Sequence, residues 1–174
     1  MDKKELISFL QYNHHLFIEL IDKLDESSFS KKVADKWTPA QQAEHIHLSI
    51  KPLNIAFRLP LFILKMMFGK ANRPSREYSA LVEKYHSKLA EGARATSNFI
   101  PKEISFSKKK QLISALKKDV AKLCKLANKY SEEELDQYIL QHPLLGKLTL
   151  REMLYFTAYH VQHHEQLVKQ ILEN

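Results

Sequence analysis

Two histidines four residues apart, His160 and His164, lie in the last helix-like stretch of the chain, residues 149–172. Thr149 followed three residues later by Glu152 matches a capping box, which predicts that a helix begins there. Residues four apart on a helix share one face, with Cβ atoms about 5–6 Å apart, so the two imidazoles can bind one metal ion together. The pair therefore predicts a metal site that takes further ligands from elsewhere in the chain.

The two histidines belong to an otherwise mostly apolar line of that helix. Read at spacings of three and four, the line consists of Met153, Thr157, His160, His164, Leu167 and Ile171. Such a line is the core-facing side of an amphipathic helix. Imidazole nitrogens on that side need partners, because an unpaired polar group is costly in an apolar core. For any one of the histidines alone, a hydrogen-bonded core residue or a surface residue is the alternative interpretation.

His45 is the candidate for a third ligand, and a local pattern predicts its helix. Thr38 is a good N-cap, Pro39 suits the first helical position, and Gln41 completes a capping box. His45 falls on an apolar line of this helix, and we expect it to face the core. We expect His47 to face solvent, because its line is polar. That line contains Lys51, Asn54 and Arg58.

Three inward histidines would leave coordination positions open to water or substrate, as in catalytic metal sites. Imidazole suits zinc, nickel, copper and iron(II), so ligand type alone does not choose the metal. The pair is not the zincin motif, because Val161 stands where that motif has a glutamate. No general base is evident, and we assign neither catalytic residues nor an organic-cofactor site. Water or a substrate thiol made acidic by the metal would have to supply the nucleophile.

The composition is typical of a soluble all-α protein. Of 174 residues, 44% are hydrophobic and 27% charged, with only 3 Gly and 6 Pro. Amphipathic helices are expected at about residues 3–24, from Pro39 onward, and at about 77–97, 108–129 and 149–172. This pattern predicts a helix bundle that forms one domain over residues 1–174, and bundles build metal sites from side chains on facing helices.

The connections between these helices carry their own expectations. Residues 25–35 read as a polar connector and residues 141–148 as a loop, while a capping box at Ser131 predicts a short turn. Pro52 is expected to kink or break the second helix. Residues 53–68 are the most apolar stretch, yet they are too short and too interrupted for a membrane span. We expect a helix or loop packed over the bundle there. The alternatives are a pocket wall or lid, and a dimer face.

The net charge and the cysteine content limit which partners and which kinds of site the protein can have. The net charge is +7 without a nucleic-acid recognition motif, so binding to nucleic acid is not favoured. The single cysteine, Cys124, excludes an internal disulfide framework and a cysteine metal cage. A signal peptide is not evident, so we expect a cytoplasmic protein that acts on a small molecule and binds no membrane.

The spacing of these residues resembles that of the DinB/YfiT-like superfamily. Its motifs here are Trp37-Thr38-Pro39, His45 eight residues after the tryptophan, and the paired histidines. Residues 142–164 are also similar to its bacterial members, and the resemblance covers essentially the whole chain. It implies an up-down-down-up four-helix bundle, often a dimer, here with an extra helical excursion between the second and third bundle helices. It also implies a divalent metal, zinc or nickel, bound by His45, His160 and His164.

Similar proteins include bacillithiol S-transferases, mycothiol-dependent isomerases and the thiol-handling domain of ergothioneine synthesis enzymes. The resemblance therefore favours a metal-dependent enzyme that transfers a low-molecular-weight thiol to an electrophile. A metal-dependent hydrolase is one alternative, and a non-catalytic bundle with a vestigial or structural metal site is another. Many members carry a glutamine three residues after the last histidine, where this chain has Leu167.

Overall fold

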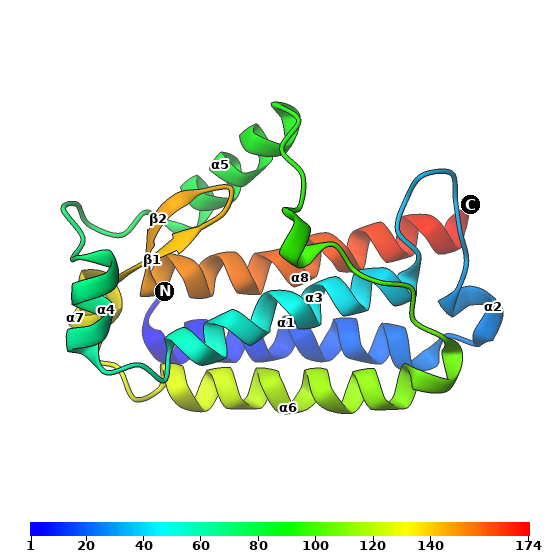
Figure 1. Ribbon diagram of the computed structural model, residues 1–174, viewed down its shortest axis with the longest axis horizontal. Helices are drawn as coiled ribbons and strands as arrows, with labels where there is room; N and C mark the ends of the chain where they lie inside the picture. The colour runs from blue at the N-terminus through cyan, green and yellow to red at the C-terminus, as the bar shows by residue number, and fades with distance from the viewer.

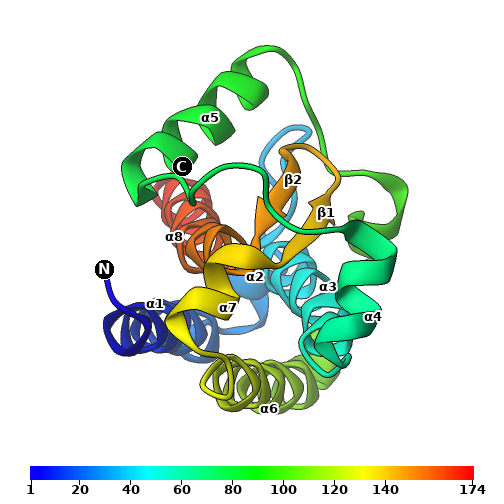
Figure 2. The same ribbon diagram turned by 90° about the vertical axis from the view of Figure 1, so that its left-hand side faces the viewer.

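Four long helices form the bundle in the computed structural model, which describes residues 1–174 (Figure 1). They are α1 (Lys3–Lys23), α3 (Pro39–Ala56), α6 (Lys109–Ala127) and α8 (Leu150–Glu173). Helices α1 and α8 run in one direction, and α3 and α6 run in the other (Figure 1). Each of α1 and α3 packs against both α6 and α8, and Figure 2 shows the four helices end-on around a shared centre. The predicted up-down-down-up arrangement is confirmed.

Local signals start three of these helices, and apolar faces hold them together. Asp2, Thr38 and Thr149 each form a complete capping box with the residue three positions later. The inward faces build one core cluster of 36 buried residues, in which the largest fully buried side chains include Phe17 and Phe29. Cys124 is part of this core. None of the helices is both long enough and apolar enough to cross a membrane.

The excursion between α3 and α6 contains two helices and two short 3-10 turns. They are α4 (Leu61–Phe68), α5 (Tyr78–Ala90), η1 (Ser97–Phe99) and η2 (Phe106–Lys108). Helix α5 lies on α8 (Figure 2), and η1 contacts α3. Helix α5 ends well before the predicted residue 97 because Gly92, with φ +90°, forms a Schellman motif. The Gly92 N–H donates to the Leu89 carbonyl, and the Ala93 N–H donates to the Lys88 carbonyl, both at 3.0 Å.

The structure corrects two predictions for the connections. Residues 141–148 are not a loop, because strands β1 (Ile139–His142) and β2 (Gly146–Thr149) pair as an antiparallel hairpin. Four-residue strands show too little alternation for the sequence to reveal them. A break at Pro52 does not occur, because helix α3 continues through this residue, which lies on the exposed side of the helix.

The shorter helices fall in the connecting segments. Helix α2 (Glu26–Phe29) lies inside the expected connector 25–35. The predicted turn after Ser131 is the short helix α7 (Glu132–Gln137), and Ser131 is its N-cap with a complete capping box. The apolar segment 53–68 divides between the end of α3 and α4, which contacts β1. It is therefore helical structure beside the hairpin, with part of α4 exposed.

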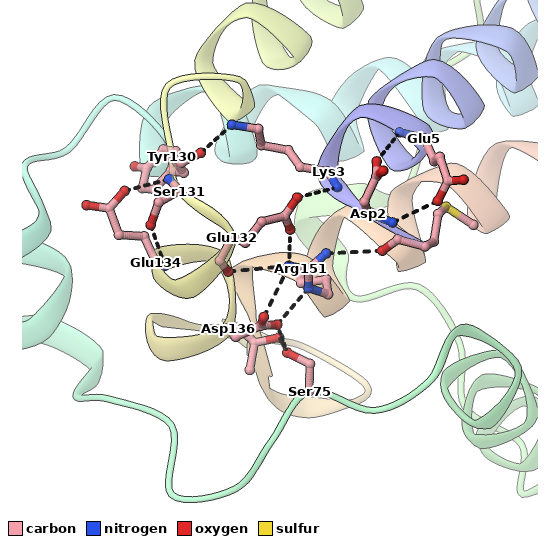
Figure 3. Close-up of polar contacts among 12 residues, drawn as sticks. Asp2, Lys3, Glu5, Ser75, Tyr130, Ser131, Glu132, Glu134, Asp136 and Arg151 are labelled. Atoms are coloured by element: carbon pink, nitrogen blue, oxygen red, sulfur yellow. Dashed lines mark hydrogen bonds and ion pairs between the residues drawn. The ribbon is translucent and has the colours of Figure 1, made fainter.

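Charged side chains at the start of α8 tie outlying segments to the bundle. Arg151 binds Glu132 and Asp136 of α7 and donates to the Met1 carbonyl at 3.3 Å (Figure 3). Asp136 also accepts from Ser75 in the excursion, at 2.5 Å. These contacts hold the N-terminus, α7 and the loop before α5 at the end of the bundle where α8 begins.

Candidate metal centre

Helices α3 and α8 bring three buried histidines to one point. His45 comes from α3, and His160 and His164 from successive turns of α8. One ring nitrogen of each lies within 4.8 Å of the others. Nε2 of His160 is 3.2 Å from Nε2 of His45 and 3.0 Å from Nε2 of His164. The structure thus places the three predicted ligands together, and metal binding itself stays a prediction.

Hydrogen bonds at the far side of two rings fix their tautomers. Nδ1 of His45 lies 2.7 Å from the carbonyl oxygen of Phe99, and Nδ1 of His164 binds Oε1 of Gln42. Both oxygens can only accept, so each Nδ1 must donate its hydrogen. The Gln42 amide is itself oriented, because its Nε2 donates to the Trp37 carbonyl. In a neutral imidazole with hydrogen on Nδ1, Nε2 carries a lone pair, and His45 and His164 both present one.

The three ring nitrogens are therefore suited to bind a cation. Two lone pairs face His160 Nε2, which can donate a hydrogen to only one of them. A metal ion among the three nitrogens would accept all the lone pairs at once, with carbonyl and amide oxygens supporting two of the ligands from behind. The residues that would hold such an ion are His45, His160 and His164.

Burial keeps these imidazoles neutral, as metal ligation requires. Burial, and then the neighbouring His164 and His45, hold the pKa of His160 well below its ordinary value. Burial and the nearby His45 do the same for the pKa of His164. Burial also lowers the pKa of His45, against the hydrogen bond to the Phe99 carbonyl, which raises it.

Aromatic side chains hold the three rings in place. Trp37 packs beside His45 at a centroid distance of 4.9 Å and is nearly parallel to His164 at 6.4 Å. Phe156 stacks on His160 at 4.8 Å with an interplanar angle of 24°. Ring positions fixed by packing are what a precise coordination site needs.

A pocket of about 840 Å³ adjoins the cluster and is lined by 34 residues, of which 18 are hydrophobic. Such a lining suits a ligand with a substantial apolar part. Leu53, Ala56 and Phe68 belong to it, so the segment 53–68 forms part of the pocket wall. Asp35 is the one acidic residue in the lining and is exposed, so no buried carboxylate is available as a general base.

The prediction that His47 faces solvent is wrong. Its side chain is buried, with Nε2 3.2 Å from Asp119 of α6. Asn54, on the same line of α3, is also buried and donates to the Asp119 carbonyl. Helix α3 packs against α6 on this side, so a line that reads as polar is covered by a second helix. His47 is nevertheless outside the three-histidine cluster.

His163 is half-buried and lines the pocket beside the cluster, with its ring against Tyr85 at 5.7 Å. The sequence missed both groups that orient the ligands. Gln42 lies three residues before His45, on the same side of its helix, and this spacing could have revealed it. Phe99 acts through its backbone carbonyl, which no side-chain pattern reveals.

A protein-family model described as the DinB superfamily matches residues 10–168. The chain belongs to the DinB superfamily. This match includes all of α3 and α6, most of α1 and α8, and the three candidate ligands. Comparisons with curated proteins and with solved structures return no match. Membership of the superfamily and the three-histidine cluster are together compatible with a metal-binding DinB-superfamily protein.

Acid should destabilise the metal-free protein. Burial lowers the pKa of His14 and of His142, both in the pocket lining, from 6.5 to about 4. The unfolded chain therefore binds protons before the folded one does, and stability falls as pH drops from 6.5 towards 4. At pH 5 each group should cost about 2 kcal/mol of unfolding free energy. Urea denaturation at pH 7 and pH 5 measures the loss of unfolding free energy. In the His14→Leu protein, the part of this loss that comes from His14 should disappear. Equal stability at the two pH values would contradict the burial of neutral histidines.

Proposed function

We propose that this protein binds zinc or nickel through His45, His160 and His164 and activates a low-molecular-weight thiol for transfer to an electrophile. The observation that carries this proposal is the convergence of three imidazoles beside a pocket without a fourth protein ligand. Such a site leaves coordination positions for a substrate. When bound, the divalent ion would lower the pKa of a coordinated thiol and favour its nucleophilic thiolate form.

The chain's own residues would bind and orient the reactants. The apolar side chains of the lining, among them Leu140 and Met153, suit the apolar part of an electrophile and exclude water from it. Lys36 and Arg94 also belong to the lining and are exposed. With only Asp35 to oppose them, they favour an anionic substrate, such as a thiol that carries carboxylates.

A metal-dependent hydrolase is the second candidate, because open coordination positions also suit water. Hydrolysis usually relies on a positioned general base, and no buried carboxylate lines this pocket. This difference favours thiol transfer. A purely structural metal is the least favoured role, because the cluster borders a large pocket.

Turnover assays separate the candidates. Zinc- or nickel-loaded protein is mixed with cysteine and 1-chloro-2,4-dinitrobenzene; transfer forms a sulfur–carbon bond, releases chloride and gives the thiol proton to solvent. We expect conjugation above the uncatalysed rate that requires metal and is lost in His160→Ala. Cleavage of 4-nitrophenyl acetate without thiol would instead support the hydrolase. Neither reaction, across several thiols and electrophiles, would contradict an enzymatic role.

A further inference from the structure

His142 is a histidine of the pocket lining that lies outside the candidate metal cluster. It ends strand β1, and its Nδ1 accepts hydrogen bonds from the backbone N–H groups of Leu144 and Leu145, both at 3.1 Å. The side chain thereby caps the turn of the hairpin. Lys84 of α5 braces the same turn, because its Nζ donates to the Leu145 carbonyl at 2.7 Å.

These contacts determine where the ring carries its hydrogen. A nitrogen that accepts from two N–H groups has no hydrogen of its own, so the neutral ring must be protonated at Nε2. Burial, and then the charge of Lys84, keep the ring neutral by lowering its pKa to about 4. His142 is thus a fixed hydrogen-bond donor through Nε2–H, with the tautomer opposite to that of His45 and His164.

The Nε2–H group is free to bind a ligand. It has no hydrogen-bond partner in the protein, since the contacts of His142 all use Nδ1. Three side-chain atoms are both sealed from solvent and unpartnered, namely His14 Nε2, His47 Nδ1 and Asn54 Oδ1. The His142 Nε2 is not among them, so it keeps some contact with solvent, and the residue belongs to the pocket lining.

The donor lies close to the candidate metal centre. The His142 ring packs edge-on against Phe156 with centroids 4.3 Å apart, and Phe156 stacks on His160. One aromatic ring therefore separates His142 from the cluster. A ligand held by the metal at one end has an N–H donor in the same pocket for its other polar group.

We infer that His142 is a substrate-binding residue whose Nε2–H donates a hydrogen bond to an oxygen acceptor, a carboxylate or carbonyl, of the molecule in the pocket. The hairpin geometry alone identifies Nε2–H as the donor. The further claim, that the same molecule also binds the metal through a thiol, rests on the proposed function. The ligand class that follows is a small thiol with an oxygen acceptor a few bonds from its sulfur.

The tautomer is tested first, by long-range ¹H–¹⁵N correlation spectra of the protein at pH 7. We expect hydrogen on Nε2 and a bare Nδ1 for His142. His14 provides an internal reference of the opposite type, because its Nδ1 lies 2.8 Å from the Leu10 carbonyl and must donate. A His142 ring with hydrogen on Nδ1 would overturn the inference.

Ligand binding is tested with two probes of similar size on cobalt(II)-loaded protein, 3-mercaptopropionate and 1-propanethiol, followed by the visible spectrum. His142→Asn keeps an oxygen near the position of Nδ1 for the turn but removes the donor. This substitution should weaken the binding of 3-mercaptopropionate about five- to tenfold, the effect of one lost hydrogen bond, and leave the affinity for 1-propanethiol unchanged. His142→Gln, which returns an N–H near Nε2, should recover part of the loss. An unchanged affinity ratio in a folded His142→Asn protein would overturn the inference.

A third probe separates this inference from the proposed function. If neither thiol changes the cobalt spectrum, thiol binding at the metal is refuted, and acetate then tests His142 alone. Acetate should shift the His142 Nε2–H resonance of the wild-type protein in a saturable way. The absence of a shift up to high millimolar acetate, together with thiol failure, would refute both proposals.

Discussion

His160→Ala is expected to abolish stoichiometric zinc binding, with affinity falling at least about a hundredfold. Loss of a group that merely supports a ligand typically costs 10- to 100-fold, and loss of a ligand itself should cost more. His45→Ala and His164→Ala should behave alike, because the nearest nitrogens of all three rings meet within 4.8 Å. Zinc content after equilibration with a competing chelator measures the effect.

Two neighbouring histidines provide matched controls. His47→Ala should retain zinc, because its ring binds Asp119 of α6. His163→Ala should also retain it, since that ring lies against Tyr85 outside the cluster, although it borders the pocket. Complete zinc loss in His47→Ala, with helical content intact by circular dichroism, would mean that the ligands are assigned wrongly.

Glu152→Ala should destabilise the protein by about 2–3 kcal/mol, the usual cost of losing hydrogen bonds to a charged group. The side chain is fully buried and accepts from Arg73 at 2.6 Å and from the Arg76 N–H at 2.7 Å. It also completes the capping box of α8 by accepting from the Thr149 N–H. Its loss would remove the shared partner of two partly exposed guanidinium groups and release the loop before α5 from the bundle.

Urea unfolding of matched variants measures this cost. Glu152→Gln preserves the shape and one acceptor, so its loss should be intermediate. Glu19→Ala removes an exposed glutamate paired with Lys23 on α1 and should change stability by less than about 0.5 kcal/mol. A Glu152→Ala protein within about 1 kcal/mol of wild type would contradict the structural role assigned to this carboxylate.

The sequence predicts most of the bundle and the site because both depend on short-range patterns. Capping boxes mark the starts of α3 and α8, and the spacing of apolar residues marks their inward faces. The same periodicity places His45 on the inward face of α3 and His160 and His164 on the inward face of α8, and the folded bundle brings the three together. A side chain four residues from another on a helix needs no tertiary information to be placed beside it.

The remaining features depend on partners far away in the sequence. His47 is buried because α6 covers its side of α3, and nothing near residue 47 reveals that helix. Phe99 supports His45 through a carbonyl of the excursion, whose path the local pattern does not determine. His142 becomes a donor only because the hairpin turn occupies its Nδ1, and the strands are too short to be recognised in advance.

Anomalous diffraction at the zinc edge, on untagged protein crystallised with zinc, examines the proposed centre itself. We predict one zinc ion about 2.0–2.1 Å from a ring nitrogen of each of His45, His160 and His164, without a fourth protein ligand. Nε2 should be the coordinating atom in all three, because it faces the shared point. A zinc-saturated crystal with no anomalous peak among these rings, or with zinc bound only by other residues, would contradict the proposed centre.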